Sequence, residues 1–264
     1  MRLTVFTSNQ PRHVALIESL AAIADEVFAI QECNTVFPGQ VQDFFRKSPV
    51  MQDYFARVTR AEAEVFGTAR FLPKNVRSLP VKMGDVSLID ASILGDALRA
   101  DAIVVFGASY IKGALCSRLV ARGAVNIHMG TSPYYRGSST NFWAMYDRRL
   151  QFVGATVHLL SRGLDSGPML YHALPEAAAV DPFVFGMRAV KAAHASLARH
   201  LADRTLRELS PVAQDRSREL RYTRNEHFTD DVAAEYLARL PGPDEIERSA
   251  RDRDLSQYLR PVAA

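Results

Sequence analysis

The run Asp101–Phe106 constrains the fold most, because it reads Asp-Ala-Ile-Val-Val-Phe, with no polar residue after the first. A strand that is apolar on both faces must be covered on both faces, as the central strands of parallel sheets are. The chain opens in agreement, with a short apolar strand at Leu3–Phe6, a polar turn, a helical pattern at Arg12–Ala24 and a second strand at Val27–Ile30. This order predicts an α/β fold, a mostly parallel twisted sheet with helices on both faces.

The rest of the chain continues the alternation and ends in a helical extension. Residues 41–66 predict one or two amphipathic helices. Packing on the sheet is the favoured interpretation, and a cap over a substrate pocket is the alternative. The charged tail from Asp244 predicts a loosely packed helix or partial disorder. The remaining predicted elements are a strand at Pro80–Met83, a helix at Asp90–Leu98, a strand at Gly154–Leu160, a helix from about Phe183 to Leu206 behind the Asp181-Pro182 cap, a short strand within Glu219–Asn225 and a helix at Asp230–Leu240.

Composition excludes several classes of protein. A net charge of +3, from 32 basic and 29 acidic residues, is too even to indicate a nucleic-acid partner. Two cysteines, Cys33 and Cys116, show no metal-ligand spacing, so we expect a reducing cytoplasm and no metal site. No apolar run approaches the roughly 18 residues of a membrane span, and the N-terminus lacks the apolar segment of a signal peptide. The first strand is not followed by Gly-x-Gly-x-x-Gly, which argues against a dinucleotide cofactor.

Three polar residues form the strongest candidate for chemistry. Asn126 and His128 lie two apart in an extended run, so both side chains point to one side. Asp165 follows a later apolar run, in a glycine-rich turn. An amide donor, an imidazole and a carboxylate suit an acyl-transfer site. The alternatives are a histidine satisfied in the core and turn roles for Asn126 and Asp165. His158 is interpreted as a packing or supporting residue, and His194 and His200 as solvated.

The motifs around these residues carry a family resemblance. Asn126-Ile-His128, with Pro133 five residues after the histidine and then Arg136-Gly137, resembles the folate-dependent formyltransferases, and so does Leu164-Asp165-Ser-Gly-Pro-Met-Leu170. The resemblance covers roughly the first two-thirds of the chain. The chain has Met-Gly-Thr-Ser at 129–132 where the family often has Pro-Ser-Leu-Leu, which affects the expected acceptor more than the chemistry.

The resemblance implies a Rossmann-like formyltransferase catalytic domain at residues 1–182 and a mostly helical C-terminal extension packed on it at 183–264. It implies Asn126, His128 and Asp165 as catalytic residues, with Asn126 and His128 stabilising an oxyanion, and 10-formyltetrahydrofolate as formyl donor, in a cytoplasmic protein that could be a homodimer. The donor's pterin is expected against two loops. These comprise Gly107, Ala108, Ser109, Tyr110, Ile111, Leu160, Arg162, Gly163 and Leu164.

The acceptor is the most open question. The chain is most similar to sugar-nucleotide N-formyltransferases of glycan biosynthesis. The alternatives are a glycinamide ribonucleotide formyltransferase of purine synthesis and a non-catalytic folate- or nucleotide-binding protein. A small-molecule acceptor is expected at Ser8, Asn9, Arg12, Tyr135 and Arg136. Ser8, Asn9 and Arg12 lie at a helix start, where a phosphate site and an ordinary helix cap are equally compatible with the sequence.

Overall fold

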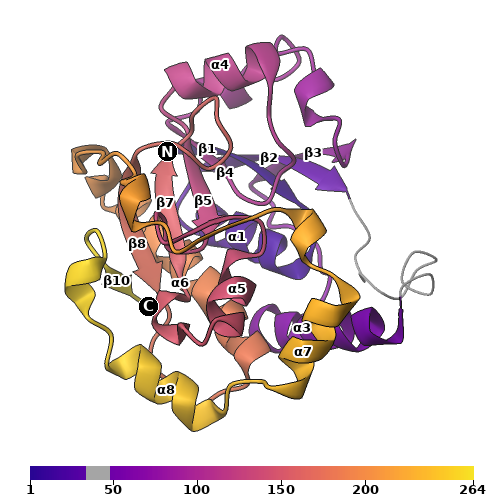
Figure 1. Ribbon diagram of the computed structural model, residues 1–264. Coiled ribbons are helices and arrows are strands. Elements are labelled where there is room, and N and C mark those ends of the chain that lie inside the picture. The colour runs from indigo at the N-terminus through magenta and orange to yellow at the C-terminus, as the bar shows by residue number, and fades with distance from the viewer. Residues whose placement is uncertain (34–47) are drawn as a thin grey trace.

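The computed structural model describes residues 1–33 and 48–264 of the chain. Within them, eight strands form one sheet in the order β10-β8-β7-β5-β4-β1-β2-β3 (Figure 1). Strands β5 and β8 are each antiparallel to β7, and the other neighbouring pairs are parallel. The strands are β1 (Arg2–Ser8), β2 (Glu26–Cys33), β3 (Val76–Lys82), β4 (Ala102–Val105), β5 (Val125–Met129), β7 (Ala155–Leu159), β8 (Met169–Leu174) and β10 (Val262–Ala263).

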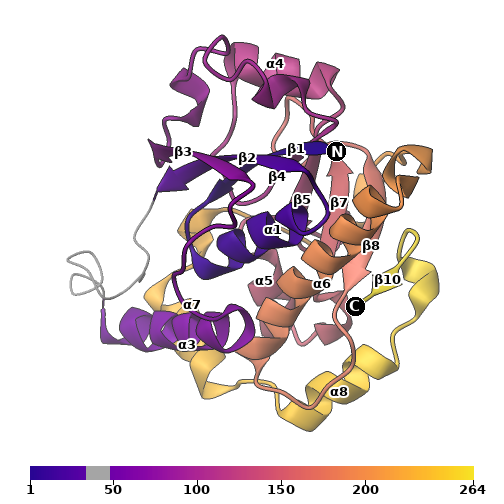
Figure 2. The ribbon, with the colours of Figure 1, turned by 180° about the vertical axis from the view of Figure 1, so that it is seen from behind.

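Helices cover both faces of this sheet, as predicted (Figures 1 and 2). The two apolar faces of β1 show why, since Leu3 and Val5 join a core with α1 and α6, whereas Phe6 joins a second core with α4. The predicted mostly parallel α/β fold is therefore confirmed. The helices are α1 (Pro11–Ala21), α3 (Pro49–Phe66), α4 (Gly113–Ala121), α5 (Thr140–Tyr146), α6 (Pro182–Ala202), α7 (Asp230–Ala238) and α8 (Pro243–Arg251).

The residues after 182 are built into the molecule at several points. Helix α6 starts behind Asp181, whose side chain accepts from the Phe183 N–H as predicted, and packs under β5, β7 and β8. A small two-stranded sheet joins β9 (Arg221–Thr223) to β6 (Tyr135–Gly137). Strand β10 extends the main sheet beside β8. A boundary at residue 183 stays a prediction.

Three local predictions were wrong. Asp90–Leu98 is not a helix but a series of turns, followed by a 3₁₀ turn at Ala97–Arg99. The backbone bonds here join residues three apart, from the Ile93 N–H to the Asp90 carbonyl and from the Gly95 N–H to the Ser92 carbonyl, and Gly95 weakens any longer helix. The tail after Asp244 is neither loose nor disordered, because α8 buries Ile246 completely.

The third concerns the packing of α3, a helix that the sequence did predict within residues 41–66. It packs mainly on helices α1, α6 and α7 rather than on the sheet, and it contributes to the wall of a cavity described below. The part of the predicted 41–66 segment before residue 48 lies outside the described residues.

Candidate active site

Strand β5 presents Asn126 and His128 on one face because its other face is committed to the core. Val125 and Ile127 pack in the core shared with α6, so the alternating residues between and after them point to the opposite side. In the antiparallel pair with β7, Asn126 lies directly opposite His158. The strand pairing therefore brings an amide and two imidazoles onto one patch of sheet.

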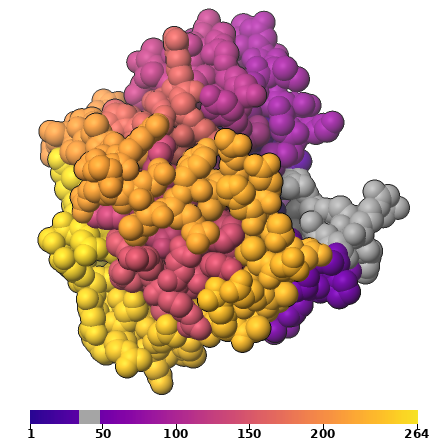
Figure 3. Space-filling view, viewed as in Figure 1, coloured from indigo at the N-terminus to yellow at the C-terminus, as the bar shows by residue number. Residues whose placement is uncertain are grey.

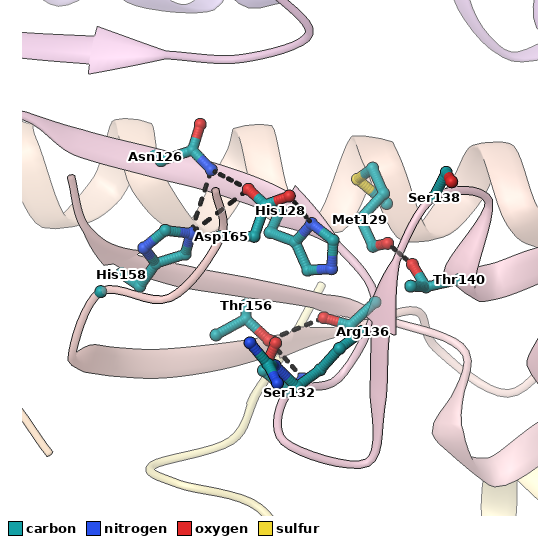
Figure 4. Close-up of polar contacts among 12 residues, drawn as sticks. Asn126, His128, Met129, Ser132, Arg136, Ser138, Thr140, Thr156, His158 and Asp165 are labelled. Carbon is teal, nitrogen blue, oxygen red and sulfur yellow. Dashed lines mark hydrogen bonds and ion pairs between the residues drawn. The ribbon is translucent and has the colours of Figure 1, made fainter. Parts of the chain in front are cut away.

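Asp165 reaches this patch from the turn between β7 and β8 and joins the other side chains in a polar cluster (Figure 4). The Asn126 amide nitrogen donates to Asp165 Oδ1 and to His158 Nε2, each at 3.0 Å. The other carboxylate oxygen, Oδ2, lies 3.3 Å from His128 Nδ1. The structure thus brings the three predicted residues together and adds His158 to them.

The hydrogen bonds fix the orientation of each member. His158 Nδ1 lies 2.8 Å from the Leu159 carbonyl oxygen, so Nδ1 carries the hydrogen and Nε2 accepts. Asn126 must then turn its nitrogen toward both acceptors, because its oxygen would face the Asp165 carboxylate at the same 3.0 Å. Both amide hydrogens are used inside the cluster. The expected role of the Asn126 amide as a donor to an oxyanion is therefore not the arrangement in this structure.

A glycine makes room for the His158 bond. A Cβ on Gly167 would lie 1.8 Å from the Leu159 oxygen and 3.0 Å from His158 Nδ1. Only glycine permits the turn to pass this close to the strand. The glycine of the Asp-Ser-Gly-Pro motif thus supports the imidazole that orients Asn126.

Asp165 is ionised in this setting. Burial raises the pKa of its carboxyl, but neighbouring groups, with His128 first among them, outweigh this effect, and the net result is a pKa well below the ordinary value. The carboxylate keeps a proton on the adjacent Nδ1 of His128. Nε2 is then the ring nitrogen of His128 that is left to contact a ligand.

His128 Nε2 is buried and has no hydrogen-bond partner among the described residues. Its ring lines a cavity of about 490 Å³ together with Asn126, His158 and Asp165. A buried polar atom without a partner is costly unless a ligand or water satisfies it. His128 therefore brings one buried nitrogen without a described partner to the wall of the cavity.

Two loops form one side of the cavity, and both were predicted. Gly107–Ile111 follows β4, and Leu160–Leu164 follows β7; of their residues only Arg162 does not line the cavity. They meet because β4 ends level with the start of β5, with Val105 beside Asn126, and the antiparallel β7 ends at the same level. The Tyr110 hydroxyl donates to the Arg162 carbonyl oxygen and ties the loops together.

A buried carboxylate holds the first of these loops. Glu32, at the end of β2, is fully buried. It accepts from the Ser109 N–H, from the Ser109 hydroxyl at 2.6 Å and from the Gly84 N–H at 2.9 Å. This residue was missed in the sequence, because its partners lie 52 and 77 positions away.

The opposite side of the cavity has polar groups but little net charge. Arg12 is the only lysine or arginine among the described residues that line the cavity, and its Nη1 is 2.8 Å from Glu62, a buried carboxylate. The rest of this side comprises Tyr54 and Val58 of α3, Ser139, Thr140, Asn141 and Phe142 around the start of α5, and Met187 of α6.

The other predicted acceptor residues do not reach the cavity. The Ser8 hydroxyl is buried and donates to the Glu32 carbonyl oxygen, and Asn9 is not among the lining residues. Tyr135 is buried and donates to Asp147, and Arg136 is buried beside Glu219 at 2.8 Å. Together with the oxyanion role of Asn126, the assignments of Ser8, Tyr135 and Arg136 make four corrections, because core packing or internal pairing had been mistaken for ligand contact. The assignment of Asn9 stays a prediction.

A fifth correction concerns His194, which is not solvated. It is 3% exposed and packs against Phe66 and Phe106, and burial lowers its pKa to about 3. Among residues 1–33 and 48–264, no helix has the length and apolarity to cross a membrane. The same residues contain no group of three or more histidine, cysteine or acidic side chains that could hold a metal ion.

Relatives of the chain are found by sequence and by structure. The methionyl-tRNA formyltransferase of Trichlorobacter lovleyi is 35% identical over 74 residues, which are 28% of this chain. The match spans only 23% of that relative's length. A 4-N formyltransferase from Francisella tularensis has 16% identity and a TM-score of 0.52, covering 85% of this chain and 76% of its own. An N-formyltransferase from Helicobacter canadensis, solved with folinic acid and dTDP-3-aminofucose, has 11% identity and a TM-score of 0.51, covering 90% of this chain and 79% of its own.

At these identities the structural likeness shows a shared fold. The family itself is shown by a model described as formyl transferase, which matches residues 53–197 and so more than half of the chain. That segment contains β5, the turn with Asp165 and both motifs on which the resemblance was based. The chain belongs to the formyl transferase family.

Proposed function

We propose that the protein transfers a formyl group from 10-formyltetrahydrofolate to the amine of a nucleotide-linked amino sugar, with His128 and Asp165 as the reacting groups and Asn126 as the residue that holds Asp165 in place. The observation that carries the proposal is the buried Nε2 of His128, which has no partner among the described residues and belongs to a ring backed by an ionised carboxylate. Preorganised donors of this kind stabilise charge that appears only in the transition state.

The formyl donor fits the side of the cavity made by the two loops. Gly107–Ile111 and Leu160–Leu164 present backbone groups to the cavity, and Glu32 and Tyr110 hold them in place. Such a wall suits the flat, hydrogen-bonding pterin ring. The donor supplies the formyl group and the leaving nitrogen, and the protein supplies position and charge.

The chain's own groups would act on the transfer as follows. The amine nitrogen bonds to the formyl carbon, and negative charge collects on the formyl oxygen. Protonated His128 Nε2 donates to that oxygen, while Asp165 holds the imidazole from the Nδ1 side. The bond from carbon to the leaving nitrogen then breaks. The proton released by the amine passes to the leaving nitrogen through water at Asp165, whose side chain is 20% exposed.

The acceptor side offers neutral polar groups that suit the sugar part of the acceptor. Asn141 Oδ1 accepts from the Gly154 N–H at 3.1 Å, which leaves its amide hydrogens available, and Ser139 adds a hydroxyl. Such neutral groups suit sugar hydroxyls, and the Arg12 charge is already balanced by Glu62. The likeness to the Helicobacter canadensis protein supports the nucleotide-linked form of the sugar.

The test is a coupled assay that follows loss of 10-formyltetrahydrofolate with different acceptors at matched concentration. The panel contains nucleotide-linked 3-amino and 4-amino deoxysugars, glycinamide ribonucleotide and methionyl-tRNA. We expect the fastest turnover with an amino-sugar nucleotide. Faster turnover with glycinamide ribonucleotide or methionyl-tRNA would reassign the acceptor. Tight folate binding without turnover of any amine would favour a non-catalytic folate-binding protein.

A further inference from the structure

One segment of the C-terminal region contacts both parts of the chain that carry the family motifs, the turn with Asp165 and the strand β6. We name residues 212–223 the C-terminal brace. Figure 3 shows orange C-terminal residues lying across the magenta segments on this face of the molecule. At one end of the brace, Val212 exchanges backbone hydrogen bonds of 2.7 and 2.8 Å with Met169, the first residue of β8. At the other end, β9 pairs with β6, directly after the Ser132–Tyr134 turn.

Between these ends, Gln214 reaches the turn that contains the reacting carboxylate. Its Nε2 donates to the Asp165 carbonyl oxygen at 2.9 Å and to the Gly167 carbonyl oxygen at 3.0 Å. If the amide were turned over, its oxygen would face these two carbonyl oxygens, so the nitrogen must lie on this side. The other amide atom, Oε1, is buried without a partner among the described residues. The side chain is therefore held by the two bonds to the turn.

The backbone conformation of the turn explains why it needs such support. Asp165 adopts a φ of 45°, in the left-handed region that side chains other than glycine rarely occupy. Its carboxylate must also meet two partners at once, Asn126 on one oxygen and His128 on the other. A rotation of the backbone at this residue would carry the carboxylate away from both. Binding the carbonyls on each side of Ser166 limits that rotation.

We infer that Gln214 is a positioning residue that fixes the Asp165 carboxylate against His128, so that the C-terminal brace completes a site otherwise built by the first two-thirds of the chain. The inference rests on the proposed function for its kinetic part and on geometry alone for its structural part. Gln214 lies outside residues 53–197, which match the family model, so the support comes from this chain's own extension.

The test compares Gln214→Ala and Gln214→Glu with Arg216→Ala, which changes an exposed residue of the same brace. Crystals of each protein with folinic acid would give the distance between Asp165 Oδ2 and His128 Nδ1, now 3.3 Å. We expect a displaced carboxylate in both Gln214 variants and an unchanged one in Arg216→Ala. An unmoved Asp165 turn in the Gln214 variants would overturn the inference. This readout needs no acceptor, so it stands even if the proposed transfer fails.

Kinetics with the best acceptor supply the second readout. Misplacing a reacting group by about 1 Å can lower turnover roughly 100-fold, so we expect a 10-fold to 100-fold loss of kcat in both Gln214 variants. The KM for the formyl donor should change less than threefold. An equal loss of kcat in Arg216→Ala would mean that the brace acts only through general stability, and would contradict a specific role.

A pH profile separates positioning from packing. The carboxyl side chain introduced by Gln214→Glu is as long as that of glutamine, but it can donate to the turn only when it is protonated. The kcat of this variant relative to wild type should therefore rise as the pH falls from 8 to 6, whereas the same ratio for Gln214→Ala should stay flat. Parallel profiles for the two variants would count against the hydrogen bonds as the cause.

Discussion

Asn126 and His158 face each other across the antiparallel pair of β5 and β7, with 3.0 Å between the amide nitrogen and Nε2. The same amide nitrogen holds Asp165, so the strand pairing sets the position of a carboxylate that belongs to neither strand. His158 thereby becomes a structural partner of the proposed catalytic residues.

We predict that loss of this contact lowers turnover. His158→Leu removes the acceptor for the Asn126 amide, whereas His158→Gln can keep an acceptor oxygen in reach. Both should fold, and His158→Leu should turn over roughly 10-fold more slowly than His158→Gln, the scale of one buried hydrogen bond. Steady-state kinetics and thermal unfolding measured together would show it. Equal turnover in the two variants would mean that only volume matters at residue 158.

The proposed reaction predicts larger losses at the reacting groups. His128→Ala removes the unsatisfied nitrogen and Asp165→Asn removes the charge behind it, so each should lower turnover roughly 100-fold or more. Folinic acid should still bind, because the loops around the pterin are untouched. His200→Ala, on the far part of α6, is the control and should remain active. Near-normal turnover in either of the first two variants would refute the mechanism.

We predict that a change at Glu32 weakens binding of the formyl donor but has less effect on turnover. In Glu32→Gln only one acceptor oxygen remains, so the new amide NH2 faces either the Ser109 N–H or the Gly84 N–H, and the charge that anchors the loop Gly107–Ile111 is lost. Hydrogen bonds to a charged group contribute about 1.5–3 kcal/mol, so folinic acid should bind roughly 10-fold more weakly or worse. Titration calorimetry would measure it, with the exposed Glu176→Gln as control. Unchanged affinity would show that the loop holds its shape alone.

Acid stability should depend on the buried His194. Its folded pKa of about 3 lies below the ordinary value near 6.5, so the unfolded chain binds the extra proton first as the pH falls. The stabilising effect of the neutral folded form is complete above pH 6.5 and is lost progressively between about 6.5 and 3. His194→Leu should therefore show a smaller drop in Tm than wild type between pH 7 and pH 5. Identical drops would place the acid sensitivity elsewhere.

The fold was predictable where single segments carried the signal. The apolar run at β4, the opening of β1, α1 and β2, and the Asp181 cap of α6 are all local, and the structure agrees with each. Strand β8 was missed although all six of its residues are buried, because its partner strand sets its conformation. The Asp90 segment has a helical apolar pattern, but its backbone bonds join residues three apart and form successive turns instead of an α-helix.

In the candidate site, only the residues that lie within the two sequence motifs could be assigned a catalytic role from the sequence. Asn126 and His128 follow from strand periodicity, and Asp165 from the resemblance. His158 was interpreted as a packing or supporting residue, but its partner Asn126 becomes visible only through strand pairing, and Glu32 only through partners tens of residues away. The predicted acceptor residues Tyr135 and Arg136 failed because a sequence does not show which charges and hydroxyls are already paired inside the protein.

The sheet edge and helix α3 form separate parts of the cavity wall, and this separation has a practical consequence. The proposed reacting groups sit on the strand surface that continues past the end of β4, while Tyr54 and Val58 belong to a separate helix. Substitutions on α3 can therefore reshape what the cavity admits without disturbing the atoms that carry out the transfer. Anyone who wants to redirect this scaffold toward a different amine should diversify α3 first and leave the strands as they are.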